Sequence, residues 1–311
     1  MQVQFLGTSS GSPSRYRNMS AVAISFDTSK QWMLVDCGEG TQHQILKTPL
    51  SPAKLAIICI THIHGDHCYG LPGLLSSMSL HGRSEPVTLI APQKLINFIH
   101  ASLALTDVNL GFDLYCHDVE ALAGPLQLAL CKIESIKLKH RVPSFGYKVT
   151  EAQVPKKLKI DQLQANNIES GPHYNTLQKG HNVDYKGTTL HAHQYTYDSY
   201  KPRVVIICGD NEKPTILSEY LNNVDLLVHE ATFTHRDLLK VGTHTGHSDA
   251  KRVAEFAQKY GVKRLALTHF SVRYHGPGML EPLKREALEH YQGDIHFAED
   301  LMCLTIPKQQ L

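Results

Sequence analysis

The chain has 311 residues, of which 42% are hydrophobic and 19% charged, and its formal net charge at pH 7 is +2. This composition is typical of a folded globular protein and excludes a disordered or fibrous one. No apolar run reaches the roughly 18 residues that a membrane span needs, and no export signal opens the chain. We therefore expect no membrane contact and a cytoplasmic location. Any nucleic-acid partner has to be held by a local patch, because the net charge is small.

Histidine usage points to metal chemistry, whereas cysteine usage does not. The seven cysteines are scattered and form no Cys-x-x-Cys pair, so we expect reduced thiols without a disulfide framework. The chain holds 20 histidines against nine phenylalanines. Neutral imidazole is the commonest protein metal ligand, and the position of these histidines along the predicted strands is therefore informative.

In chain order, the first elements that the sequence predicts form a β-meander, with strands near residues 3–5, 21–26 and 32–35. Five apolar runs follow, and each ends at a residue able to bind a metal or transfer a proton. Short apolar runs fit strands that are buried on both faces. Functional residues in α/β sheets usually lie just beyond the C-terminal ends of such strands. The runs are residues 55–60, 133–138, 204–208, 224–228 and 265–267.

Helical patterns separate these strands. Apolar residues recur at helical spacing over 71–78. A second helix is expected after Ser248, which can cap it, and Gly261 supplies its end. Strands and helices mixed in this way predict two sheets covered by helices, a layered α/β sandwich.

One stretch lacks the apolar pattern of a core element. Residues 151–184 contain Pro155, Gly171-Pro172 and Gly180, together with a lysine cluster at 156–159. We expect a protruding arm here. Between residues 148 and 186 six lysines face four acidic residues, so a solvated surface insertion without a binding role is an equal alternative on composition alone.

The strongest chemical signal follows the apolar run 55–60. His62, His64, Asp66 and His67 place four ligand-type side chains within six residues, and zinc takes such imidazole and carboxylate ligands at about 2.0–2.2 Å. We expect the first two to face one metal ion and the last two a neighbouring ion. Further ligands are expected at other strand ends, namely His140, His269 and a bridging carboxylate, Asp210.

Paired divalent ions about 3.5–4 Å apart are typical of hydrolases that attack phosphate esters. The alternative is that these are separately satisfied polar residues at strand ends. That interpretation suits isolated histidines such as His81 or His296. It does not suit the cluster, because burying several imidazoles and a carboxylate together without a metal is costly.

The ligand pattern resembles that of the metallo-β-lactamase superfamily, which implies a four-layer αββα sandwich. Within it, the chain is similar nearly end to end to the bacterial short-form ribonuclease Z family of tRNA 3′-processing endoribonucleases. The motifs that carry the resemblance are Phe5-Leu6-Gly7-Thr8-Ser9, Asp36-Cys37-Gly38-Glu39-Gly40-Thr41-Gln42, Gly70-Leu71-Pro72-Gly73-Leu74-Leu75, Phe145-Gly146-Tyr147, His229-Glu230-Ala231-Thr232-Phe233 and Gly246-His247-Ser248.

The resemblance implies an enzyme that removes 3′ trailers from precursor tRNA by phosphodiester hydrolysis and leaves a 3′ hydroxyl. It implies two zinc ions per subunit, with manganese as an alternative, and a homodimer. One ion is expected at His62, His64, His140 and Asp210, and the other at Asp66, His67, His269 and Asp210. Asp66 is also expected to take a proton from water. His247 is expected to protonate the leaving oxygen, with Glu230 orienting it.

For substrate binding we expect phosphate contacts from Arg15 and Arg17, because guanidinium matches phosphate oxygens. The family resemblance implies that the arm grips tRNA, and its candidate residues here are Gly171, Pro172, Tyr174 and Lys179. Phe145, Tyr147 and Tyr174 can stack on bases or pack internally.

The chain departs from the family pattern at three places. Asn211 stands where threonine is usual, Asp249 stands where threonine or serine is common, and the segment at Lys179 has one lysine where family members often have two. Asp36 is expected either to orient a ligand histidine or to form a turn.

The domain prediction is one catalytic domain over 1–311, with a flexible substrate-binding arm at about 151–184. Two other functions stay open from sequence. The chain can be a hydrolase of small phosphodiesters with the arm as a lid, or a metal-bearing RNA-binding protein without turnover.

Overall fold

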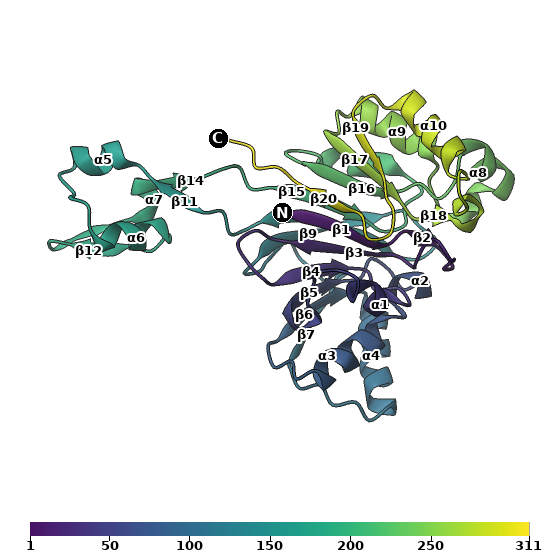
Figure 1. The fold of residues 1–311 in the computed structure, drawn as a ribbon, viewed down its shortest axis with the longest axis horizontal. Coiled ribbons are helices and arrows are strands. Elements are labelled where there is room, and N and C mark those ends of the chain that lie inside the picture. The colour runs from purple at the N-terminus through teal and green to yellow at the C-terminus, as the bar shows by residue number, and fades with distance from the viewer. Residues whose placement is uncertain (311) are drawn as a thin grey trace.

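Two seven-stranded sheets pack face to face in the computed structural model, which describes residues 1–310 (Figure 1). The first sheet has the strand order β20-β1-β3-β4-β5-β6-β7. Strands β1, β3 and β4 pair antiparallel, which confirms the predicted meander. The bounds are β1 Gln2–Gly7, β3 Ala21–Ser25, β4 Trp32–Val35, β5 Leu55–Cys59, β6 Val87–Ala91, β7 Leu114–Asp118 and β20 Cys303–Thr305.

The second sheet has the order β19-β17-β16-β15-β10-β9-β8. Four neighbouring strands, β15, β16, β17 and β19, run parallel. The pairing of β16 with β17 continues to Glu230 opposite Thr268. Glu230 is therefore the last residue of the strand, whereas the sequence pattern ends the strand at residue 228. The bounds are β8 Leu126–Gln127, β9 Cys131–Leu138, β10 Ser144–Glu151, β15 Val204–Cys208, β16 Leu226–Glu230, β17 Arg264–Thr268 and β19 Asp294–Phe297.

Helices cover the outer face of each sheet (Figure 1). Between the sheets lies a core of residues from both, including Phe5, Met33, Tyr147 and Val228. Burial of each such side chain contributes about 1.5–3 kcal/mol. The predicted four-layer αββα sandwich is therefore confirmed. The covering helices are α1 Thr41–Ile45, α3 Leu71–Leu80, α4 Gln93–Leu105, α8 His235–Val241, α9 Ala250–Lys259 and α10 Glu281–His290.

Helix α9 corrects one detail of the sequence analysis. Its N-cap is Asp249, whose carboxylate accepts a hydrogen bond from Arg252 N at 2.8 Å. The predicted cap, Ser248, instead donates to the carbonyl of Asn211 at 2.6 Å. Serine and aspartate are both good N-cap residues, so the sequence alone does not distinguish Ser248 from Asp249. The contact of Ser248 with Asn211 leaves Asp249 as the cap.

The chain between β10 and β15 projects from the body as an arm (Figure 1). Strands β11 and β14 pair antiparallel, from Lys156 opposite Asp198 to Leu158 opposite Thr196. The arm thus continues to Asp198, past residue 184 where the sequence pattern placed its end. It also has an apolar cluster of its own around Leu163 and Leu177. Its elements are β11 Lys156–Leu158, α5 Ile160–Ala165, α6 Pro172–Gln178, β12 Val183–Tyr185, β13 Thr188–Leu190, α7 Ala192–Tyr195 and β14 Thr196–Asp198.

Short elements join the two halves near the metal-ligand motifs. Strand β2 (Ser9–Ser10) pairs in parallel with β18 (Phe270–Ser271), and Phe270 N donates to the Thr8 carbonyl, which places the start of β2 beside His269. Helix α2 (Gly65–Cys68) carries the end of the histidine-rich motif. Within residues 1–310 no helix has both the length and the apolar character that crossing a membrane requires. The remaining 3-10 helices are Pro52–Lys54, Pro214–Tyr220, Thr243–Thr245 and Val272–Tyr274.

Candidate metal centre

The histidine-rich loop after β5 is held in shape by the carboxylate of Asp36. Asp36 follows β4 with a left-handed φ of 62°. Its Oδ1 accepts a hydrogen bond from Thr61 N at 2.7 Å, and its Oδ2 accepts from Thr61 Oγ1 at 2.9 Å. His67 Nδ1 also lies 2.7 Å from Asp36 Oδ2. The contact expected between Asp36 and a ligand histidine is therefore present, and it fixes the orientation of the His67 ring.

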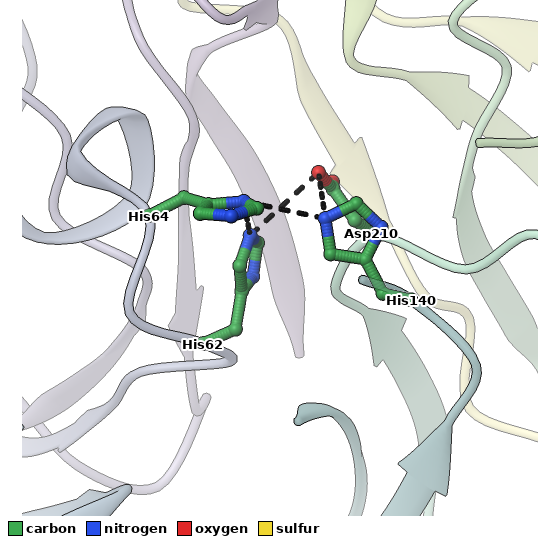
Figure 2. Close-up of side chains that lie close together, drawn as sticks. All are labelled: His62, His64, His140 and Asp210. Atoms are coloured by element: carbon green, nitrogen blue, oxygen red, sulfur yellow. Dashed lines mark hydrogen bonds and ion pairs between the residues drawn. The ribbon is translucent and has the colours of Figure 1, made fainter. Parts of the chain in front are cut away.

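The first ligand group consists of His62, His64, His140 and Asp210, which converge from three loops (Figure 2). His64 Nδ1 lies 3.0 Å from His62 Nε2 and 3.2 Å from His140 Nε2. Asp210 Oδ2 lies 3.6 Å from His62 Nε2 and 3.7 Å from His140 Nε2. These four residues are those that the sequence analysis assigned to one ion.

The second group consists of Asp66, His67 and His269. The Nε2 atoms of the two histidines are 3.2 Å apart, and Asp66 Oδ2 lies 3.6 Å from His67 Nε2 and 3.5 Å from His269 Nε2. Asp210 Oδ1 lies 3.4 Å and 3.3 Å from the same two nitrogens. One oxygen of Asp210 thus faces each group, which is the arrangement of a bridging carboxylate.

The spacing of these atoms fits divalent cations. Ligand bonds of about 2.0–2.1 Å in a tetrahedron place neighbouring ligand atoms about 3.3 Å apart, and the separations in both groups lie close to that value. The distal ring nitrogens have their own partners: His62 Nδ1 lies 3.0 Å from Thr61 Oγ1, and His140 Nδ1 lies 2.8 Å from the Gly246 carbonyl. Such partners direct the opposite nitrogen toward a metal. The His/Asp clusters therefore form a divalent-metal site.

The carboxylates and imidazoles at the centre shift one another's pKa values. Burial raises the pKa of Asp210, but His269, His67 and the other nearby histidines outweigh burial and hold that pKa well below its ordinary value. Burial and the neighbouring His67 lower the pKa of His62. For His67 burial is outweighed by Asp36 and the other carboxylates around it, which raise its pKa. Ionised carboxylates and a neutral His62 are the forms in which these groups bind cations.

His247 and Glu230 form a pair next to the metal ligands. His247 Nδ1 lies 3.1 Å from Glu230 Oε1, and Glu230 is buried. Burial lowers the pKa of His247, but the Glu230 and Asp210 carboxylates outweigh burial and raise it to about 9. Thr232 Oγ1 donates to Glu230 Oε2 at 2.5 Å and lies 3.1 Å from His269 Nδ1. Thr232 therefore connects a ligand histidine to this pair.

The residues predicted to contact RNA differ in how exposed they are in the structure. Arg15 is exposed. Arg17 is 9% exposed, and its Nη1 donates to Thr8 Oγ1 at 2.6 Å and to the Ala298 carbonyl at 2.7 Å. These contacts indicate a structural role for Arg17. Two of the three aromatic residues expected to stack on bases, Phe145 and Tyr147, are buried in the core between the sheets, which favours the packing alternative for them.

The arm residues lie on or next to helix α6. Gly171 precedes the helix as its N-cap, Pro172 begins it and Lys179 follows it. Pro172 and Lys179 are exposed. Tyr174 is half-buried, and its hydroxyl donates to the Ile168 carbonyl at 2.8 Å, so Tyr174 stabilises the arm whether or not it touches a substrate.

A cleft of about 470 Å³ opens over the metal ligands. It contains residues from both halves of the sandwich, including His64, Asp66 and His247. Sequence reasoning missed three residues near it: Thr61, Thr232 and Arg141. The two threonines act through contacts between segments remote in sequence, which no local pattern reveals. Arg141 directly follows a predicted ligand, and that position was the available signal.

Comparison with known proteins places the chain among ribonucleases. A ribonuclease Z of Pseudomonas putida is 45% identical over 305 residues, which are 97% of this chain and 95% of the relative. A ribonuclease Z of Marinobacter nauticus is 41% identical, covering 99% of this chain and 97% of the relative. A family profile described as "Anti-Pycsar protein Apyc1" matches residues 1–142.

Solved structures agree with the sequence comparison. Human tRNase Z, short form (ELAC1), superposes with a TM-score of 0.69 at 28% identity and covers 99% of this chain and 100% of that chain. The metallo-β-lactamase fold protein YhfI from Bacillus subtilis has a TM-score of 0.67 at 16% identity, covering 97% of this chain and 98% of that chain, and so shares the fold. Since relatives above 40% identity match nearly the whole length, the chain belongs to the ribonuclease Z family.

Proposed function

We propose that this protein is a metal-dependent endoribonuclease that removes 3′ trailers from precursor tRNA by phosphodiester hydrolysis and leaves a 3′ hydroxyl on the tRNA. The observation that carries the proposal is the Asp210 carboxylate between two ligand groups, with the His247–Glu230 pair beside it. Ribonuclease Z relatives match 97% of the chain, arm included, so a hydrolase specialised for small phosphodiesters is not favoured. Because precursor tRNA is the substrate, we also propose a cytoplasmic location.

The ligand groups suit two divalent ions, which we propose to be zinc, with manganese as the alternative. The all-nitrogen-and-oxygen donor set accepts either metal. The first ion is assigned to His62, His64, His140 and Asp210, and the second to Asp66, His67, His269 and Asp210. Divalent ions in such a site neutralise phosphoryl charge and acidify water.

The protein's own residues divide the proton transfers. We assign proton uptake from the attacking water to Asp66, whose Oδ2 is fixed by a hydrogen bond from Gly11 N at 2.8 Å. The leaving 3′ oxygen receives a proton from Nε2 of His247, because Nδ1 faces Glu230. Glu230 keeps that imidazole oriented and favours its protonated form. A general acid of this kind typically contributes 10²–10⁴-fold.

The arm is proposed as a flexible tRNA-binding element of the one catalytic domain, with Gly171, Pro172, Tyr174 and Lys179 at its contact helix. Arg15 is proposed to contact the RNA 3′ end. Strand β10 begins next to the metal centre, where Phe145 N donates to the Thr61 carbonyl. Its other end, Glu151, leads to the arm. The arm therefore projects from the sandwich on the side away from α2, which carries the end of the histidine-rich motif (Figure 1).

That geometry supports a homodimer in which each arm serves the partner's cleft. The helices on the first sheet also expose large apolar side chains: Leu46 is 72% exposed, and Leu80 and Leu105 are each 87% exposed. Light scattering during size-exclusion chromatography checks the dimer. A monomer at concentrations where the enzyme is active would count against it.

The central test is an incubation of zinc-loaded protein with a 3′-extended tRNA transcript. We expect one cut that leaves a 3′ hydroxyl on the tRNA product. His247→Ala should cleave 10²–10⁴-fold more slowly. No cleavage by the wild-type protein, or undiminished cleavage by the variant, would refute the proposed function.

A further inference from the structure

Arg141 is a free cation at the entrance to the metal centre. It directly follows His140 and lines the same cleft as His64, Asp66 and His247. Its side chain is exposed, and no residue among those described pairs with its guanidinium. Among the described residues that line the cleft, it is the only lysine or arginine. An unpaired guanidinium beside a site for anionic substrate is available to bind that substrate.

The backbone that carries Arg141 is held firmly, although its guanidinium is free. His140 Nδ1 donates to the Gly246 carbonyl at 2.8 Å. Gly246 has a φ of 74°, and a Cβ there would lie 2.9 Å from His140 Nδ1 and 3.1 Å from Arg141 Cγ. Gly246 therefore packs closely against the aliphatic part of the Arg141 side chain and against His140.

Tyr69 offers a second, chemically different surface on the same cleft. It follows α2 and is 65% exposed. One side of its ring covers Gly65, where an added Cβ would meet the ring at 2.2 Å, and its centroid lies 6.4 Å from that of Phe98. Tyr69 belongs to the half of the sandwich with the first sheet, whereas Arg141 belongs to the half with the second.

We propose that Arg141 and Tyr69 form a nucleotide-binding subsite at the mouth of the cleft. Arg141 binds the phosphate next to the scissile one, and Tyr69 stacks on the base of the adjacent nucleotide. Guanidinium matches phosphate oxygens bidentately, and tyrosine rings are common platforms for unpaired bases. This inference rests on the proposed function, because it names how the same site holds RNA that flanks the cleavage point.

Arg141→Ala tests the phosphate contact, with Lys137→Ala as the matched control. Lys137 is an exposed cation of the preceding strand that does not line the cleft. We expect Arg141→Ala to raise KM for precursor tRNA about tenfold and to reduce the salt slope of tRNA binding by about one. Lys137→Ala should match the wild type. Hydrolysis of bis(p-nitrophenyl) phosphate, which has no flanking nucleotide, should be unchanged.

Each other outcome decides against the subsite. An equal loss on the small ester would place Arg141 at the scissile phosphate or in the scaffold. An equal effect of Lys137→Ala would mean a general charge effect. Wild-type protein that cuts tRNA while Arg141→Ala matches it would overturn the subsite alone, whereas wild-type protein that fails to cut would overturn the proposed function as well.

Tyr69 is tested by comparing Tyr69→Ala with Tyr69→Phe, which keeps the ring. Stacking contributes about 1–3 kcal/mol per base, so Tyr69→Ala should raise KM for precursor tRNA about tenfold and Tyr69→Phe should stay near wild type. Tyr260→Ala removes a half-exposed ring outside the cleft and serves as the control. Equal losses in the Ala and Phe variants, or no loss in either, would exclude stacking by Tyr69.

Discussion

Asn211 ties together three segments beside the metal centre. Its side-chain Nδ2 donates to His229 Nε2 at 3.0 Å, and its Oδ1 accepts from the backbone N of Lys139 and of Lys213, each at 3.2 Å. Its own backbone N donates to Glu230 Oε1 at 2.8 Å. These contacts explain how asparagine serves at a position where the family resemblance implies threonine: the amide bonds to more groups than a hydroxyl can reach.

Replacing Asn211 should therefore affect stability. Asn211→Ala leaves a buried imidazole nitrogen and two backbone N–H groups without their partner, so we expect the free energy of unfolding to fall by about 2–3 kcal/mol. Asn211→Thr should cost less, because its hydroxyl retains one donor and one acceptor. Urea denaturation of the metal-loaded variants measures both. An alanine variant within about 0.5 kcal/mol of the wild type would show that these bonds carry little net stability.

His247 and Glu230 should act as one unit. Glu230→Gln keeps the shape of the side chain but removes the charge that favours a protonated His247, so we expect kcat on precursor tRNA to fall by at least 10²-fold. Because both residues are proposed to serve the same proton transfer, the double variant with His247→Ala should be no slower than His247→Ala alone. Single-turnover cleavage rates measure this. Additive losses would assign Glu230 a separate role.

The seven proposed ligand residues were accessible from sequence because each lies at the end of an apolar run, where strand geometry brings side chains together. Thr61 and Thr232 were not. A hydroxyl near a strand end is ordinary, and the role of Thr232 depends on His269, 37 positions away in sequence. The burial of Arg17 was not apparent from sequence for the same reason. A loop sequence does not show that its guanidinium is buried over Phe270, 4.9 Å from the ring centroid.

At the scale of elements, strands buried on both faces were predictable from their continuous apolar runs, whereas the helices and strands inside the predicted arm were not. Its apolar residues are few and widely spaced, and they form a core only when β11 pairs with β14. Leu163 comes from the first half of the arm and Leu190 from the second. The pattern that identifies a core element in sequence is therefore absent from either half alone.

The two ends of the arm lie next to each other, so the arm can be deleted without disturbing the sandwich. Ser199 N donates to the Pro155 carbonyl at 2.9 Å, so a short glycine-serine linker can replace residues 156–198 without strain. We expect this deletion to raise KM for precursor tRNA at least tenfold, because the tRNA contacts proposed for the arm would be lost. Hydrolysis of bis(p-nitrophenyl) phosphate should persist.

The full-length protein and a variant that keeps the arm but carries Lys179→Ala serve as controls for this deletion. The single variant should show a smaller rise in KM, since it removes one phosphate contact. Equal loss of activity on tRNA and on the small ester in the deletion variant would mean that the arm supports the fold and not the substrate.

At the scale of the whole molecule, the metal centre joins the two halves of the sandwich. Asp36, His62 and His67 follow strands of the first sheet, whereas Asp210 and His269 follow strands of the second. Two of these residues, Asp36 and His269, have left-handed φ values of 62° and 61°, a conformation that costs roughly 1–2 kcal/mol for residues with a Cβ. The fold therefore holds strained backbone from both halves at one point, and cation binding there links the halves.

Removing the metal should consequently loosen the entire sandwich and not only abolish cleavage. A ligand at a thousandfold excess over its Kd contributes about 4 kcal/mol of stability, so we expect chelation to lower Tm by roughly 10 °C and added zinc to restore it. Elemental analysis of the restored protein should give two ions per chain. Asp210→Asn, which weakens the carboxylate shared by both groups, should reduce the metal content and the zinc-dependent gain in Tm together. A chelated protein with unchanged Tm would show that the halves are held by their apolar core alone.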